Sequence, residues 1–108
     1  MTFRYNRGSA FAWIVYSNST GISILQSYNV ASVTDNAVGT ATIHYSNAMA
    51  NAQPCIAGCA GSTSVRGIMQ TTDVAATTTS VRILGFIPSS AAADDFGRNM
   101  IVIYGDRA

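Results

Sequence analysis

The sequence predicts an all-β domain, an antiparallel β-sandwich of about seven to eight short strands. Short runs of β-branched and aromatic residues recur roughly every ten residues, and clusters of turn residues separate them. The residues on which coiled coils and helical bundles depend are scarce, since the 108 residues include no Lys, no Glu and only two Leu. A chain of this length holds one domain. We therefore expect a single sandwich over residues 1–108, in which residues 1–9 form an extended arm.

The first half of the chain contains three expected strand regions. Residues 10–16 are aromatic and β-branched, and a polar cluster follows them. Residues 22–28 continue as a strand, which residues 30–33 are expected to extend. After a turn signal at residues 35–39, residues 40–46 alternate between polar and apolar side chains. This period of two is typical of half-buried strands.

The second half contributes four more β-prone runs, at residues 55–60, 64–70, 79–87 and 100–104. A connector of small residues, 47–54, precedes them. Pro88 ends the longest run, because proline cannot donate to a strand ladder. Residues 89–96 are the one segment in which we expect a helical turn, with Ser89 or Ser90 as its N-cap.

Several of these strands are apolar on both faces, which predicts self-association. In the longest run one face carries Val81, Ile83, Gly85 and Ile87, and the other carries Arg82, Leu84 and Phe86. The first strand shows the same two-sided pattern. A monomeric sandwich needs only one apolar face on each sheet. The candidate interface residues between subunits are Trp13, Arg82, Leu84 and Phe86.

The composition excludes several classes of protein. Charged residues make up 10% of the chain, its net charge is +1 and its mean hydropathy is +0.23. These values argue against disorder, and six scattered Arg residues form no basic stripe for nucleic acid. We expect neither a membrane insertion nor a signal peptide, since no apolar run is long enough. A surface with so little charge is expected to be covered largely by other subunits.

The cysteines and the single histidine indicate no metal site and no cofactor. Cys55 and Cys59 stand four apart, so a disulfide between them requires a turn at residues 57–58. Two buried free thiols, which pack as small hydrophobes, are favoured. His44 lies within an alternating strand, on its polar face, where a half-exposed histidine is expected.

The acidic and basic residues leave two interpretations open. Asp94 and Asp95 form a pair that suggests glycoside hydrolysis or Ca²⁺ binding, although a solvated turn is favoured. Arg66 and Arg82 lie among apolar neighbours and require partners. Salt bridges to Asp73 or to the Asp pair are favoured, and an anionic ligand or a glycan is the alternative. The chain contains no G-x-S-x-G nucleophile motif, so we expect no catalytic residue.

Residues 12–36 and 39–49 resemble a sequence pattern of tail-fibre-like proteins of tailed bacteriophages. That pattern reads A-W-V-N-F-N-G-T-G, then a strand, then S-F-N-V-S-S-I-T-D-N-G-T-G, and ends in T-T-A-M. The last strand, residues 100–105, is also similar, whereas residues 54–98 match in style only. The chain departs from the pattern at Tyr16 and Ser17, and again at residues 37–38. These changes preserve the β pattern and leave any specific ligand open.

The resemblance implies a structural virion protein, a homotrimeric fibre domain that attaches to the host. It implies binding to a host cell-surface glycan or protein and contacts with other virion proteins, but neither catalysis nor nucleic acid. It also implies synthesis in the host cytoplasm and a place on the tail or another exterior part of the virion. Residues 89–98 are charged, aromatic and rich in turn residues. Their candidate receptor-facing residues are Asp94, Asp95, Phe96 and Arg98.

Two other functions agree with the same sequence. One is a capsid decoration, head-fibre or collar protein of the virion. The other is a monomeric carbohydrate-binding module with an exposed aromatic platform, which Trp13 or Tyr16 would supply. The number of chains in the native particle distinguishes the module from an assembled fibre domain.

Overall fold

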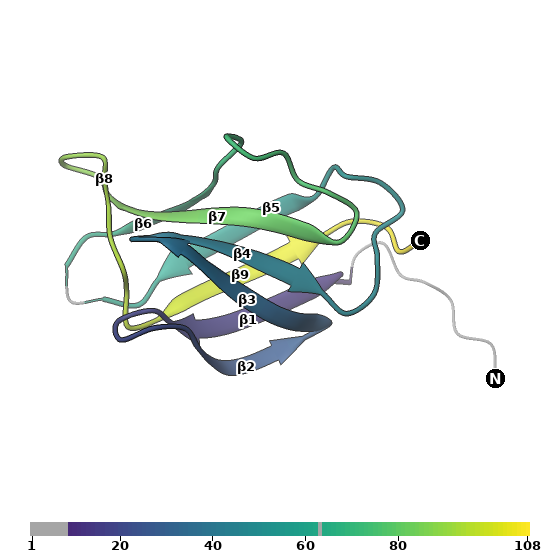
Figure 1. Cartoon of the computed structure of the whole chain (residues 1–108), viewed down its shortest axis with the longest axis horizontal. Coiled ribbons are helices and arrows are strands. Elements are labelled where there is room, and N and C mark those ends of the chain that lie inside the picture. Colours follow the sequence, from purple (N-terminus) through teal and green to yellow (C-terminus); the bar gives the residue numbers. More distant parts are fainter. Residues whose placement is uncertain (1–8, 63) are drawn as a thin grey trace.

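A computed structural model describes residues 9–62 and 64–108 and has the expected all-β architecture. Within these residues two antiparallel sheets pack against each other and no helix forms (Figure 1). The expected amino-terminal arm lies outside the described residues, apart from Ser9. In the described part of the chain, no helix has the length and apolar character needed to cross a membrane.

The first sheet, called sheet A, has the strand order β2-β1-β9-β5. Its strands are β1 (Ala12–Ser17), β2 (Ser23–Tyr28), β5 (Cys55–Ala60) and β9 (Asn99–Tyr104). The central strands β1 and β9 pair antiparallel over their length, with Ile14 opposite Ile101. Strands β2 and β5 are therefore the two edges of sheet A.

The second sheet, sheet B, has the order β3-β4-β7-β6. Its strands are β3 (Val30–Ala37), β4 (Thr40–Tyr45), β6 (Gly67–Gln70) and β7 (Ser80–Ile87), and β8 (Ala92–Ala93) pairs with β7. Strands β4 and β7 lie at its centre. The chain therefore contributes the first hairpin, β1–β2, to sheet A and the second, β3–β4, to sheet B.

The core lies between the two sheets and follows the period of two that the sequence predicted. Alternate residues of β1, β4, β7 and β9 are buried. The largest fully buried side chains are Phe11, Ile14, Ile43, Met49, Val81, Ile83, Ile101 and Ile103. Each such side chain stabilises the fold by about 1.5–3 kcal/mol relative to an exposed one. At one end of the core the rings of Phe11 and Tyr45 meet edge to face, with centroids 4.9 Å apart.

Asn29 separates two strands where the sequence analysis expected one. Its φ of 57° turns the chain from β2 in sheet A to β3 in sheet B. The side-chain Nδ2 of Asn29 donates to the carbonyl of Phe11 at 3.0 Å, and its Oδ1 accepts from the backbone and side-chain nitrogens of Asn47, each at 3.0 Å. Asparagine tolerates the left-handed conformation better than most residues. The expectation of one continuous strand from residue 22 to residue 33 is therefore wrong.

Two turns also differ from the expectation. The turn predicted at residues 35–39 is confined to residues 38–39, because β3 continues to Ala37 and pairs there with Thr40. The segment expected to form a helical turn, residues 89–96, forms a hairpin with β7, and its one helical-type turn lies at residues 87–91. Residues 88–91 form its turn, in which the N–H of Ala91 donates to the carbonyl of Ile87 at 2.7 Å. Pairing of β8 with β7 then keeps the chain extended.

The connections between strands gather at two opposite ends of the sandwich. The carboxyl-terminal residues and the start of β1 lie at one end (Figure 1). At the opposite end, which we call the loop end, lie residues 18–22, 38–39, 61–62, 64–66 and 88–98. The segment that the sequence analysis selected as receptor-facing therefore belongs to the end remote from the carboxyl terminus.

Candidate functional site

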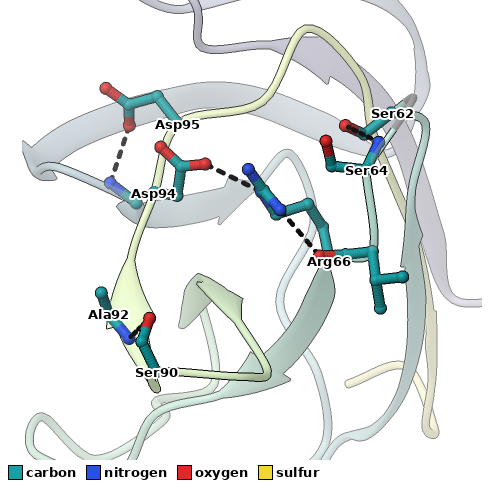
Figure 2. A network of polar contacts seen from close by, with 9 residues as sticks. Ser62, Ser64, Arg66, Ser90, Ala92, Asp94 and Asp95 are labelled. Carbon is teal, nitrogen blue, oxygen red and sulfur yellow. Dashed lines mark hydrogen bonds and ion pairs between the residues drawn. The ribbon is translucent and has the colours of Figure 1, made fainter.

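At the loop end, Asp94 forms an ion pair with Arg66 from the loop before β6. The Nε of Arg66 donates to Oδ2 of Asp94 at 2.9 Å, and its terminal nitrogen donates to the carbonyl of Val65 at 2.8 Å (Figure 2). The two side chains remain 21% and 35% exposed. The expected salt bridge of Arg66 is confirmed, with Asp94 as its partner.

Asp95 points away from Asp94 and joins two other segments of the loop end (Figure 2). Its Oδ1 accepts hydrogen bonds from the backbone N–H of Gly39 at 2.7 Å and from Nδ2 of Asn18 at 2.9 Å. The N–H of Asn18 in turn donates to the carbonyl of Phe96 at 2.8 Å. Asp94 and Asp95 therefore hold neighbouring loops in place separately. They lie outside helices and strands, as the sequence analysis favoured, but they are half-buried and hydrogen-bonded and not freely solvated.

The structure changes the role of two other residues in the predicted receptor-facing loop. Phe96 is only 3% exposed, and its ring packs against Gly85 of β7. It cannot contact a receptor in this conformation, because its apolar ring closes the end of the core. Arg98 is exposed, and the aliphatic part of its side chain packs against Gly61. Of the four candidate residues, Arg98 is the most exposed, whereas Asp94 and Asp95 are half-buried.

The four candidate interface residues lie on two opposite surfaces of the sandwich. Trp13 belongs to the outer face of sheet A, because its neighbours Ala12 and Ile14 face the core. Arg82, Leu84 and Phe86 alternate with the buried residues of β7 and so belong to the outer face of sheet B. All four side chains are half-buried. The candidates therefore define two surfaces rather than one.

Arg82 and Phe86 have partners within the chain. Arg82 forms an ion pair with Asp73 at 3.4 Å, as expected, and the Phe86 ring covers Gly67 of the neighbouring strand. Hydrogen bonds lower the pKa of Asp73, chiefly the one from the Thr71 hydroxyl, and Arg82 adds to this effect. The outer face of sheet B is thus partly covered by contacts of its own.

The cysteines are free, as the sequence analysis favoured, but both are exposed in the single chain and not buried in its core. Both lie on β5, four residues apart on one continuous strand, which places them on the same side of the sheet. Strand geometry puts their Cα atoms about 13 Å apart, too far for a disulfide between them. No turn forms at residues 57–58, the feature that such a disulfide would need.

His44 lies half-buried on sheet B, where its Nε2 shares a hydrogen bond of 2.8 Å with the Thr34 hydroxyl. This position agrees with the half-exposed strand histidine that the sequence predicted. Within residues 9–62 and 64–108, no three His, Cys, Asp or Glu side chains lie close enough together to hold a metal ion. The groups at the loop end hold loops together through hydrogen bonds and one ion pair.

Burial shifts the ionisation of two core tyrosines. Desolvation raises the pKa of Tyr16 to about 12, and the negative charges of Asp95 and Asp35 add to the effect. Desolvation alone raises the pKa of Tyr45 to about 12. The Tyr45 hydroxyl is buried without a hydrogen-bond partner in the described residues. Tyr16 is therefore a core residue, and it does not form the exposed aromatic platform that the sequence analysis considered for a carbohydrate-binding module.

Three asparagines of structural importance were not singled out in the sequence. Asn18 and Asn99 are each 4% exposed, and Asn29 forms the corner described above. The Nδ2 of Asn99 donates to the carbonyls of Tyr16 and Phe96, at 3.1 and 3.4 Å. Their position in the sequence could have indicated this role, because each asparagine lies at or next to the end of an apolar run. Their long-range partners are set by the tertiary fold.

Comparisons of the chain with protein-family models, with curated proteins and with solved structures found no match. The arguments about function therefore depend on the residues themselves. Two features of the structure bear on function. One is the loop end, whose segments Asp94 and Asp95 hold together, and the other is the outer surface of each sheet.

Proposed function

We propose that this chain is a structural virion protein of a tailed bacteriophage, a non-catalytic tail-fibre-type domain that acts in host attachment. The resemblance to fibre proteins covers residues 12–36 and 39–49, which include strands β1 to β4. It therefore spans one hairpin from each sheet and the corner at Asn29. Because the resemblance covers strands of both sheets, it supports a fold similar to that of the fibre proteins.

The observation that carries the proposal is the unequal distribution of charge between the two sheets. None of the four strands of sheet A contains a charged residue. In sheet B, β3 carries Asp35 and β7 carries Arg82. A protein that works alone in water has no reason to keep the solvent side of one sheet free of charge. A subunit of a homotrimeric fibre does, because that side becomes interior.

The loop end supplies the surface for binding in this proposal. The contacts of Asp94 and Asp95 hold its segments in fixed positions, so little ordering is needed when a ligand binds. Arg98 and exposed serines, among them Ser62, Ser64 and Ser90, offer donors for a cell-surface glycan or a polar protein surface. Three copies on one fibre would add avidity to weak single contacts.

The proposal is tested by locating the chain on a particle. Antibody against the purified chain is applied to virions from a bacterial strain that carries its gene, and labelled particles are viewed by electron microscopy. Label at the tail is expected. Label on the capsid would replace the proposal with the decoration or head-fibre alternative. Virions of that strain that remain unlabelled, while the antibody still detects the chain in the cells, would overturn a virion role.

A further inference from the structure

The register of sheet A defines a continuous outer face. Trp13 lies opposite Tyr28 on β2 and Val102 on β9, and Val102 lies opposite Ala57 on β5. Every second residue along each strand faces the same way, so the other outward-facing residues of these strands belong to the same surface. We call the whole set face A: Trp13, Val15, Ser17, Ser23, Gln26, Tyr28, Cys55, Ala57, Cys59, Met100, Val102 and Tyr104.

Face A is mostly apolar, and its polar residues are Gln26 together with Ser17 and Ser23 at the loop end. Two of its aromatic side chains stand well out of the protein, since Tyr28 is 44% exposed and Tyr104 is 40% exposed. Four strands of six residues give a face of about 20 by 19 Å, or roughly 400 Å². This is as large as the largest apolar patch on a typical monomer, which is often a site of interaction.

The two cysteines add an independent indication that face A is covered. Free cysteine is among the residue types most often buried in folded proteins. Here both Cys55 and Cys59 are exposed, and both belong to face A. A surface that holds every cysteine of the chain has the composition of an interior, so we expect it to be buried in the working form of the protein.

The shape of face A differs between its two edges. At the β5 edge the side chains of Ala57 and Cys59 are small, and together with Gly58, Met100 and Val102 they line a shallow open hollow of about 310 Å³. At the β2 edge Tyr28 projects from the sheet. A hollow at one edge and a projecting ring at the other allow the β2 edge of one copy to fit the β5 edge of the next.

The outer face of sheet B has a different character. Polar side chains of β3 and β4 form hydrogen bonds with one another on this face. Thr34 pairs with His44 at 2.8 Å, and the Thr42 hydroxyl donates to Asn36 at 2.7 Å. Arg82 brings a positive charge with its partner Asp73. These polar groups are solvated or paired already, and burying them against a second copy would cost free energy.

We infer that copies of this chain associate through face A, with the projecting β2 edge of one copy against the β5 hollow of the next. The occupant is a second copy because the projecting Tyr28 edge and the β5 hollow are complementary in shape, and because no strand of sheet A supplies a charge that would select a charged partner. The guanidinium of Arg107 lies at the β2 edge, where it donates to the Tyr28 hydroxyl. A flat pair of faces would bury about half of the 800 Å² per partner that is usual for stable complexes. Head-to-tail contacts bring in the two edges as well, and such contacts form a closed ring when the rotation between successive copies closes.

This inference rests on the proposed assembly and is tested with two matched substitutions. Ala57→Arg places a charge in the hollow on edge strand β5, and Met69→Arg places one on edge strand β6, at the outer face of sheet B. Both residues are exposed in the single chain, so neither substitution disturbs its core. Native mass spectrometry should show about three chains for the unaltered protein and for Met69→Arg, but one chain for Ala57→Arg.

The thiols give a second measurement that needs no variant. Cys55 and Cys59 should react slowly with a maleimide reagent in the native assembly and at least tenfold faster in Ala57→Arg. A native multimer that Met69→Arg dissociates, or one whose thiols react at the rate of a denatured chain, would overturn the role of face A and leave the proposed fibre function intact. A native protein that stays a single chain at all concentrations would overturn the homotrimer itself.

Discussion

The carboxylate of Asp95 accepts a hydrogen bond of 2.7 Å from the backbone N–H of Gly39, which lies 56 residues earlier in the chain. This bond joins the approach to β9, the last strand of sheet A, to the turn of the β3–β4 hairpin in sheet B. The same carboxylate oxygen receives the side chain of Asn18 from the β1–β2 connection. One carboxylate therefore holds together three connections at the loop end.

Replacing Asp95 should destabilise the protein more than replacing its neighbour. Asp95→Ala leaves the Gly39 N–H and the Asn18 amide without their acceptor, which should lower the free energy of unfolding by about 1–3 kcal/mol. Asp94→Ala removes an ion pair that is partly exposed, and a loss of about 1 kcal/mol or less is expected. Urea unfolding followed by circular dichroism measures both. Equal losses for the two variants would contradict the role given to Asp95.

Gly39 should tolerate no side chain. Its φ is 71°, and a Cβ there would lie 2.6 Å from the backbone nitrogen of Asp94 and 2.7 Å from the carbonyl oxygen of Gly85. Gly39→Ala should therefore destabilise the fold by more than 1 kcal/mol, through backbone strain and displacement of the Asp95 loop. Gly97→Ala is the control, because a Cβ at Gly97 meets nothing within 4 Å. Its thermal midpoint should change little.

The sequence predicted the strands well where local pattern and tertiary environment agree. The residues of β5 match the predicted run 55–60, and β4, β7 and β9 begin or end within one residue of the prediction. Each of these runs is apolar or alternates between polar and apolar residues, and turn residues precede or follow it. Two-residue strand β8 was missed because Ala92 and Ala93 have no strand propensity of their own, and pairing with β7 keeps them extended.

The candidate site was harder to predict because its members are distant in sequence. The pattern around residues 94–98 indicated a loop with charge and an aromatic ring, but an isolated Phe carries no sign of the direction it faces. Phe96 is buried because the sandwich leaves a space beside Gly85 that its ring fills. The pairing of Arg66 with an aspartate followed from the cost of an unpaired guanidinium among apolar residues. Which aspartate pairs with Arg66 could be seen only in the folded structure, where the partner is Asp94.

The contribution of the Asn29 side-chain amide to stability can be tested by a single substitution. Asn29→Asp keeps the oxygen that accepts from Asn47 and the tolerance for a positive φ, but it places a carboxylate against the carbonyl of Phe11. A loss of about 1–3 kcal/mol is expected, since a hydrogen bond is replaced by repulsion. Asn36→Asp makes the same chemical change at an exposed site whose oxygen only accepts from Thr42. That variant should unfold at nearly the same urea concentration as the original protein.

The two core tyrosines should make the fold sensitive to alkali. The pKa values of Tyr16 and Tyr45 rise from 10.0 to about 12 on folding, so between these values the unfolded chain has lost protons that the folded chain keeps. Stability is therefore complete below pH 10 and falls as pH rises toward 12, by about 3 kcal/mol at most for each tyrosine. Tyr45→Phe removes a buried hydroxyl that has no partner in the described residues, so it should change stability little at pH 7. It should also reduce the loss of stability between pH 10 and 12 by about half, as measured by urea unfolding at each pH. An unchanged slope would show that Tyr45 does not couple folding to pH, whereas adding Tyr16→Phe should remove most of what remains.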